Sequence, residues 1–501
     1  LDLEHVSAVY RYGYLARKLR LSVQEMIALM HLSGLDPFQP LDQEDSPAED
    51  GSSSDTRPPM IRFLELVETI SSSPLSVSQL LYLFQHIDPS GKISPSISDV
   101  LSFAQALRRD LQRIEQEHTV VDDPTGETFR NKLSMVYGNE AADLFFGLLN
   151  DTVLIEVDYS QSEPELPAEV LEHSNRLFYD HFRKKLKFHG VMTDHQKSSL
   201  LVLPAVTAEL GDAIEELYQR GQDFVVSFFD RYPELQELYE NHLASAASPE
   251  EKMAALLPAF LPTLHAKLKH QQIQQVLASR FDAPAGLVGL LLENGSLLQA
   301  EGQAGVPAIA DFLDLEKGGL TADFYYSDQV AGDADQANLH AESVNYRTGA
   351  LSLPVHQDGS DRVISGVWRG YLEAPSNGFW NFYVEADEGA AITLELAGKL
   401  VPLASSNGVW QNSQPVELQA GKLYEIRLVA EKIQKKLVLR WEGKGIGKTT
   451  VPAHGFYPAQ TVRSFQATYL RLMKILTLAA RLGLSPNEIE YFAGEGGVPV
   501  D

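Results

Sequence analysis

Hydrophobic residues change their spacing twice along this chain of 501 residues. Up to about residue 315, and again over 461–501, apolar residues recur every three or four positions, which is the spacing of an amphipathic helix. Between 316 and 460 apolar and polar residues alternate, which is typical of strands with one buried face. We therefore predict a multidomain, mainly α protein: a body of stacked helix pairs (1–315 and 461–501) carrying an inserted antiparallel β-sandwich (316–460).

The helical segments share a pattern in which Leu-Ser-x-x-Glu or Leu-Ser-x-x-Gln opens the second helix of a pair. In such a capping box the serine accepts a hydrogen bond from the third helical amide, and the Glu or Gln side chain returns to the serine amide. The predicted boxes are Ser22 with Glu25, Ser76 with Gln79, and Ser485 with Glu488. A degenerate copy over 276–292 has Asp282 in the cap position. Recurring helix pairs stack side by side into an extended layer.

The composition restricts the classes of partner. A net charge of −27 disfavours a nucleic acid, whose phosphates require clustered Lys and Arg. No apolar run reaches the roughly 18 residues of a membrane span, so we expect no transmembrane segment. The acidic, Pro- and Ser-rich stretch 39–59 is predicted to be a mobile exposed loop. Because the chain starts at Leu1 without a Met or a signal segment, we expect a fragment of a longer protein.

The stretch LRWEGKGIGKTTV, residues 439–451, has some features of a phosphate-binding loop. Such a loop needs a glycine at position 442, separated by four residues from the Gly447-Lys448 pair, but Glu442 stands there. Val451-Pro452 follows where a helix should present its N-terminus to the phosphate. We therefore predict a strand that ends in a solvated loop, and no nucleotide site.

Six motifs follow one another through the strand block: Gly319-Leu320 with Tyr325-Tyr326, Trp368-Arg369-Gly370, Pro375 to Phe382, Asp387-Glu388-Gly389, Leu418 to Tyr424, and Leu439-Arg440-Trp441. Their types and order resemble those of the protective-antigen-type β-sandwich. The resemblance implies that the stretch 439–451 is the last strand of that fold with its exit loop.

Four helical segments resemble the α-helical shell of the A subunit of bacterial insecticidal Tc toxin complexes: residues 8–38, 80–96, 177–194 and 472–492. Members of that family are secreted homopentamers that bind target cells, insert a channel and deliver a toxic enzyme held by partner subunits. The resemblance implies a shell fragment acting at the host cell surface, with the sandwich as a receptor- or glycan-binding domain. It also implies that the regions which bind the other subunits are absent here.

In sugar-binding members of the protective-antigen-type family, two consecutive aspartates hold a calcium ion that grips sugar hydroxyls. Asp387 and Glu388 occupy that turn here, with a glutamate in the second place, so a plain turn is favoured over a calcium site and no cofactor is expected. Trp410 and Asn412 fall in a polar stretch predicted to be a loop, where an indole beside amides can stack on a sugar. The predicted glycan-binding residues are Asp387, Glu388, Trp410 and Asn412; the alternative for Trp410 is a ring folded over the sandwich edge.

No constellation of residues predicts catalysis. His181, His189 and His195 lie close in sequence but lack the i, i+4 spacing of a metal site, and GxSxG is absent. A basic run is either a solvated strand face or a patch for anionic glycans or lipid headgroups: Lys432, Lys435, Lys436, Arg440, Lys444 and Lys448. We predict a non-enzymatic scaffold that presents a binding domain. The alternatives are a structural scaffold with a shielding insert, and an accessory chain of a carbohydrate-active enzyme.

Overall fold

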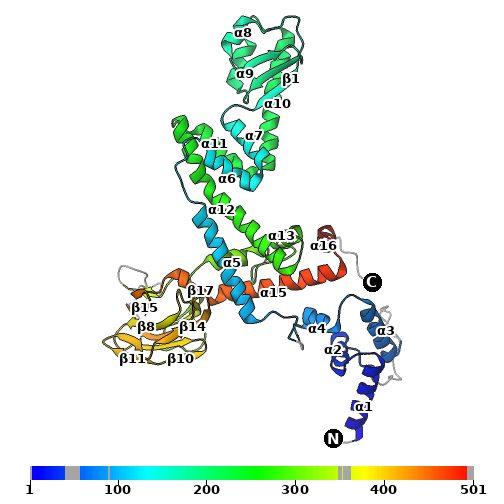
Figure 1. The fold of residues 1–501 in the computed structure, drawn as a ribbon, viewed down its shortest axis with the longest axis vertical. Helices are drawn as coiled ribbons and strands as arrows, with labels where there is room; N and C mark the ends of the chain where they lie inside the picture. Colours follow the sequence, from blue (N-terminus) through cyan, green and yellow to red (C-terminus); the bar gives the residue numbers. More distant parts are fainter. Residues whose placement is uncertain (1–2, 40–56, 89–90, 348–352, 354–362, 494–501) are drawn as a thin grey trace. The chain divides into compact units, whose positions relative to one another are not determined.

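The computed structural model describes residues 3–39, 57–88, 91–347, 353 and 363–493 (Figure 1). Apart from three short strands between residues 154 and 189, helices and antiparallel strands divide the chain as the hydrophobic spacing predicts, and the mainly α fold class with an inserted β-sandwich is confirmed. The chain forms two compact units: Leu1–Arg109 together with Ile273–Asp501 (unit 1), and Asp110–Gln272 (unit 2). The predicted acidic loop at 39–59 lies largely outside the described residues.

Unit 1 begins with four helices: α1 (Leu3–Lys18), α2 (Val23–Ser33), α3 (Pro59–Ser72) and α4 (Val77–Gln85). They enclose a small core in which Met26 and Phe63 are fully buried. The capping boxes predicted at Ser22 and Ser76 are both formed and open α2 and α4. Local side-chain chemistry therefore fixes where these helices start.

The other helices that belong wholly or partly to unit 1 are α5 (Ile97–Glu117), α12 (Pro249–Phe281), α13 (Ala285–Glu293), α14 (Ile309–Leu313), α15 (Ala459–Leu482) and α16 (Pro486–Ala493), with short 3-10 turns at Asp314–Glu316 and Ala453–Gly455. Phe465 of α15 packs against Phe103 of α5 and Phe312 of α14, with ring centroids 6.1 and 5.3 Å away. These helices thus share an aromatic core of their own.

Two helix starts in this region test the capping predictions. The box at Ser485 is formed, since its hydroxyl accepts from the Glu488 amide and the Glu488 carboxylate accepts from the Ser485 amide. Asp282 is not a cap, which corrects the prediction: α13 begins at Ala285 with Pro284 in the cap position. Asp282 has a left-handed backbone (φ 50°), whereas an N-cap residue takes extended angles.

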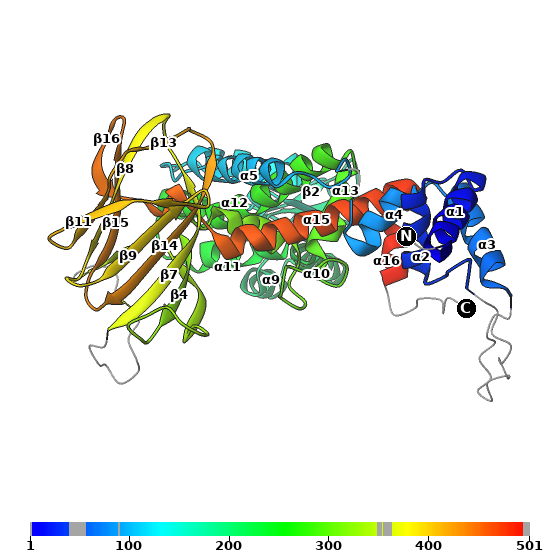
Figure 2. The same ribbon diagram turned by 90° about the horizontal axis from the view of Figure 1, so that it is seen from below.

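The β-sandwich of unit 1 consists of two antiparallel sheets (Figure 2). The first has the order β10-β9-β14-β7-β4-β5, with β17 also on β7; the second has the order β11-β12-β8-β15-β16, with β13 on β8 and β6 on β15. The strands are β4 (Leu320–Tyr325), β5 (Gln336–Ala341), β6 (Asn345–Tyr346), β7 (Ile364–Glu373), β8 (Gly378–Ala386), β9 (Ala391–Leu396), β10 (Lys399–Val401), β11 (Leu403–Ser406), β12 (Val409–Asn412), β13 (Val416–Leu418), β14 (Leu423–Ile433), β15 (Leu437–Gly443), β16 (Ile446–Thr450) and β17 (Phe456–Pro458).

The two sheets differ in how their outer faces are covered. Strand β8 alternates between buried and partly exposed residues, so only its inner face, with Trp380, Phe382 and Val384, is packed. Strand β4 is buried at nearly every position, and β7 is buried over its first half. Because α15 contacts both β4 and β7, the first sheet is covered on its outer face as well.

A polar clamp fixes the sandwich to α5. Arg108, only 2% exposed, donates from Nη1 to the carbonyl of Phe456 at 2.8 Å, and its guanidinium lies 4.1 Å from the ring centroid of Tyr457. The Tyr457 hydroxyl donates to Glu373 at 2.8 Å, and Arg109 pairs with the same carboxylate. Burial opposes ionisation of Glu373, but the bonds from Arg109 and Tyr457 outweigh it and lower its pKa. The sandwich is therefore held in a defined orientation on α5.

Unit 2 packs its helices around a small sheet. Its elements are α6 (Glu127–Tyr137), α7 (Asn139–Leu149), β1 (Leu154–Asp158), α8 (Ala168–His173), β2 (Leu177–Asp180), β3 (Lys185–His189), α9 (Asp194–Leu201), α10 (Ala208–Arg231), a 3-10 turn (Pro233–Leu235) and α11 (Gln236–Ala244), with parts of α5 and α12. The capping box at Thr193 opens α9.

The three strands of unit 2 are a departure from the sequence prediction, which expects helices up to about residue 315. They form an antiparallel sheet of order β1-β3-β2. Leu186 and Phe188 of β3 alternate with Lys185 and Lys187 and lie in the core of unit 2. A period of two over five residues is the pattern of a strand, and burial of Leu186 and Phe188 in the core of unit 2 stabilises the strand at this place.

Candidate functional site

Trp410, predicted to stand in a loop as a stacking platform, lies instead in strand β12. It is the cross-strand partner of Val384 in β8, and cross-strand partners point to the same face of a sheet. Val384 is completely buried, and Trp410 packs against the same sandwich core. The indole therefore lies on the inner face of the sandwich, and the loop prediction for this residue is wrong.

Asn412 also points inward, and it is only 4% exposed. Its side-chain oxygen accepts from the amide of Phe382 at 2.7 Å, and its side-chain nitrogen donates to the carbonyls of Trp380 (3.3 Å) and Gln414 (2.7 Å). The amide thus satisfies the backbone N–H of Phe382, which falls between the β12 and β13 ladders on this side of β8. Its contacts are structural, with no donor directed to the outside.

The predicted turn residues Asp387 and Glu388 have different surroundings. One carboxylate oxygen of Asp387 accepts from three consecutive amides, those of Gln434, Lys435 and Lys436, at 2.6, 2.8 and 3.0 Å. It caps the turn between β14 and β15, as short acidic side chains commonly do. Glu388 is exposed beside it. In the described part of the chain no group of three or more His, Asp or Glu side chains is arranged to hold a metal ion.

The basic run of the sequence divides between ion pairs and exposed positions. Lys436 and Arg440 both pair with Glu385, at 2.9 and 2.8 Å. Burial of Glu385 is outweighed by these cations, which lower its pKa. Lys448 lies 4.0 Å from the ring centroid of Tyr383. These groups lie on the open outer face of the second sheet, where the Glu385 carboxylate is shared by two of the cations.

Two of the glycines in the stretch 439–451, Gly443 and Gly445, are required by the local structure. A Cβ atom on Gly443 would lie 2.5 Å from the ring of Trp380, so only glycine fits beneath that indole. Gly445 has a positive φ of 78° in the turn between β15 and β16. Lys448 follows on β16, a strand and not a helix. The predicted strand is present as β15, but the predicted loop is wrong, because the chain turns at Gly445 and pairs back on β15 as strand β16.

A pocket of about 160 Å³ opens where the first sheet meets α15. Three arginines from three separate elements line it: Arg369 of β7, Arg427 of β14 and Arg463 of α15. Tyr371 and Glu425 also line it. Burial is the main cause that raises the pKa of Tyr371, so the phenol is neutral at physiological pH.

Two of these guanidinium groups are already held in position. Arg369 pairs with Asp323, which is itself buried, and Arg427 lies 3.1 Å from Glu395. Each of these pairs engages one guanidinium nitrogen, and an arginine has five N–H donors in a planar fork. Arg463 is exposed and forms no ion pair with any of the described carboxylates. The pocket is thus rich in oriented donors, and it has one unpaired cation.

The sequence carries no signal for this pocket, because its arginines are far apart along the chain and become neighbours only in the fold. The histidines considered as metal ligands are likewise dispersed: His181 and His189 belong to the β2–β3 region, and His195 stands on α9. None of the described helices has the length and apolar content needed to cross a bilayer.

No family model and no curated protein matches this chain. Among solved structures, it is similar to an anti-sigma factor domain-containing protein from Clostridium clariflavum, with 26% identity over 28% of this chain and 48% of that chain, and a TM-score of 0.24. It is also similar to the transport component C2-II of the C2 toxin from Clostridium botulinum, with 18% identity over 28% of this chain and 27% of that chain, and a TM-score of 0.21.

A third similar structure is the A domain of epithelial adhesin 6 from Candida glabrata, in complex with Galb1-3GlcNAc. It shows 15% identity over 28% of this chain and 87% of that chain, with a TM-score of 0.22. The chain spans about half of the anti-sigma factor protein and about a quarter of the toxin component. At these TM-scores the likenesses assign no function.

Proposed function

We propose that this chain is a segment of the cell-binding subunit of a bacterial toxin complex and that it acts without catalysis. In this role the helices are a scaffold, and the β-sandwich binds an acidic glycan of the host cell surface in the three-arginine pocket. The resemblance of the helical segments to the Tc toxin shell supports the toxin role. It further implies a secreted homopentamer that works with other toxin subunits through regions outside this chain.

The pocket is the observation that supports binding. A guanidinium fork matches a carboxylate or sulfate with two parallel hydrogen bonds, and such charge-assisted bonds are roughly twice as strong as neutral ones. Asp323 and Glu395 orient two of the forks in advance, which reduces the entropy lost on binding. Tyr371 offers a ring face for the C–H side of a sugar, and Glu425 can accept from a hydroxyl. An acidic monosaccharide unit satisfies all of these groups together.

The clamp between α5 and the sandwich supports the scaffold role. A domain that presents a ligand site on a larger body needs a fixed orientation, and Arg108, Glu373 and Tyr457 provide it through buried polar contacts. The pocket lies beside this junction, because β7 contributes both Glu373 and Arg369.

A glycan array probed with the purified chain tests the proposal. We expect binding to sulfated, sialylated or uronic-acid glycans over neutral ones, and binding that survives EDTA because the donors are guanidinium groups. Arg463→Gln should reduce the affinity about tenfold or more, since a hydrogen bond to a charged group is worth about 1.5–3 kcal/mol. The control is Arg440→Gln, which removes an equal charge on the outer face of β15 and should leave binding unchanged.

Three outcomes would overturn the assignment of the site. Equal binding by Arg463→Gln and wild type excludes the pocket as the glycan site. Loss of binding in EDTA assigns the glycan site to the turn at Asp387 and Glu388. Absence of binding to any glycan leaves the sandwich as a shielding insert on a structural scaffold.

A further inference from the structure

The hairpin that joins β2 and β3 in unit 2 ends in four exposed residues, His181-Phe182-Arg183-Lys184. The Phe182 residue is 98% exposed, more than any other large hydrophobic residue in the described part of the chain. A phenylalanine in water gains nothing for the fold, because stabilisation by apolar side chains comes from their burial. We therefore expect the Phe182 ring to contact a surface outside this unit.

The tip is held in shape by its own hydrogen bonds. Asp180 accepts from the amide of Arg183 at 3.1 Å, and the carbonyl of Lys184 accepts from the amide of Tyr159 at 3.1 Å. Lys184 takes the left-handed conformation (φ 52°) that closes the turn. The exposed phenylalanine thus stands on a defined hairpin turn.

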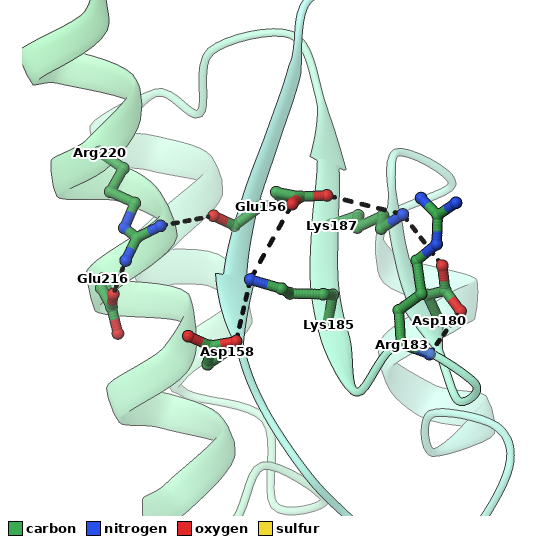
Figure 3. A network of polar contacts seen from close by, with 8 residues as sticks. All are labelled: Glu156, Asp158, Asp180, Arg183, Lys185, Lys187, Glu216 and Arg220. Carbon is green, nitrogen blue, oxygen red and sulfur yellow. Dashed lines mark hydrogen bonds and ion pairs between the residues drawn. The ribbon is translucent and has the colours of Figure 1, made fainter.

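The basic residues of this hairpin fall into two groups, and Figure 3 shows the group at the base together with Arg183 of the tip. Lys185 lies 2.9 Å from Asp158, and Lys187 lies 3.0 Å from Asp180 and 3.6 Å from Glu156. The network is continued by Arg220 of α10, whose guanidinium donates to the carbonyl of Glu156 at 3.0 Å. The cations at the base of the hairpin are therefore neutralised by carboxylates of the sheet.

The two cations at the tip differ from those at the base. The side chains of Arg183 and Lys184 form no ion pair with any described carboxylate. The hydrogen bond from Lys187 is the main cause that lowers the pKa of Asp180, and the nearby charge of Arg183 lowers it further. Both tip cations follow Phe182 directly, so an exposed aromatic ring and two exposed positive charges share one turn. This local charge contrasts with the net charge of −27 of the whole chain.

We propose that this hairpin tip, residues 181–184, binds the surface of anionic lipid membranes. Phe182 enters the interfacial region, where aromatic rings are favoured, and Arg183 and Lys184 contact lipid phosphates. The acidic remainder of the chain opposes this weakly, because charges more than about 8 Å away are screened at physiological ionic strength. The proposal does not rest on the sugar pocket, which lies in unit 1.

A lipid surface fits the tip better than a folded protein partner does. A specific protein interface buries about 800 Å² on each side, around an apolar core. Four residues on a convex turn are too few for such an interface, whereas a fluid interface closes around a single inserted ring. A single tip binds weakly. Lipid vesicles are the suitable probe, because one vesicle offers surface for many tips at once.

The experiment is co-sedimentation of the full chain with vesicles of phosphatidylcholine alone and of phosphatidylcholine with phosphatidylserine. We expect binding to the serine-containing vesicles only, and less binding as salt is raised. Phe182→Ser, and Arg183→Gln with Lys184→Gln, should each reduce the bound fraction at least threefold. The control is Phe379→Ser in β8, which removes a phenylalanine that is 65% exposed but lies opposite Glu417, and it should bind like wild type.

These substitutions change exposed side chains, and circular dichroism will verify that each variant is folded. Equal binding by Phe182→Ser and wild type, or equal binding to both kinds of vesicle, overturns the proposal. Capture of the tip by immobilised polyglutamate without any vesicle binding also overturns it, since the partner is then an acidic protein.

Discussion

Substitution of Asn412 by alanine separates a structural role from a ligand-binding role for this residue. The alanine leaves the buried amide of Phe382 without its side-chain partner, while the carbonyl of Gln414 can turn to water because that residue is exposed. A buried polar group left unsatisfied costs about 1–3 kcal/mol. We therefore expect a loss of about 1–3 kcal/mol in the stability of the sandwich.

Tryptophan fluorescence during urea denaturation is the appropriate assay. All four tryptophans of the chain lie in the sandwich core or pack against it, so the signal reports on this domain alone. The free energy follows from the midpoint and slope of the transition by linear extrapolation. The control is Gln411→Ala on the same strand, an exposed position where we expect a change within about 0.5 kcal/mol.

The result that refutes this reasoning is equal stability of Asn412→Ala and wild type combined with a loss of glycan binding. The amide would then face a ligand and not the backbone of β8.

Three further predictions concern other parts of the chain. Deletion of 317–459 with a short linker should leave the helical signal of unit 1 in circular dichroism, because α5, α14 and α15 share their own aromatic core; loss of helix beyond the deleted residues contradicts this. Lys448→Ala should change stability by no more than about 1 kcal/mol, the size of one exposed cation–π contact, and calorimetry should detect no ATP binding to either protein. Burial, with Lys132 nearby, lowers the pKa of His118. The unfolded chain therefore takes up a proton near pH 6.5 before the folded one does, and unit 2 loses stability as pH falls from 7 towards 5. Urea denaturation at both pH values should show a smaller pH effect for His118→Gln, and an unchanged effect would exclude this histidine as the cause.

Features coded by neighbouring residues could be predicted from the sequence. The capping boxes at Ser22, Ser76 and Ser485 depend on residues three positions apart, and each is formed. Alternation over the segments that form β9, β14 and β15 likewise predicts the sandwich, because a strand with one buried face repeats every two residues.

Features that depend on distant partners could not be predicted. The polar residues around Trp410 favour a loop, yet most of them are exposed positions of β11 and β12, while the indole and the amide of Asn412 turn inward. The role of Asn412 requires an amide of β8 that is 30 residues away in sequence. The three-arginine pocket requires β7, β14 and α15 to be packed together first. The glycan roles of Asp387 and Glu388 stay predictions.

The path of the chain through its two units determines the order in which they can fold during synthesis. Unit 2 is one continuous stretch, and its core contains no residue made later. Unit 1 consists of two stretches, before and after unit 2. Within it, Arg108 donates to the carbonyl of Phe456 across a separation of 348 residues. Domains fold as units while the ribosome proceeds, and contacts between distant residues form slowly. A nascent chain stalled before residue 456 therefore carries a folded unit 2. The part of α5 that belongs to unit 1 still lacks its contacts with β17 and α15.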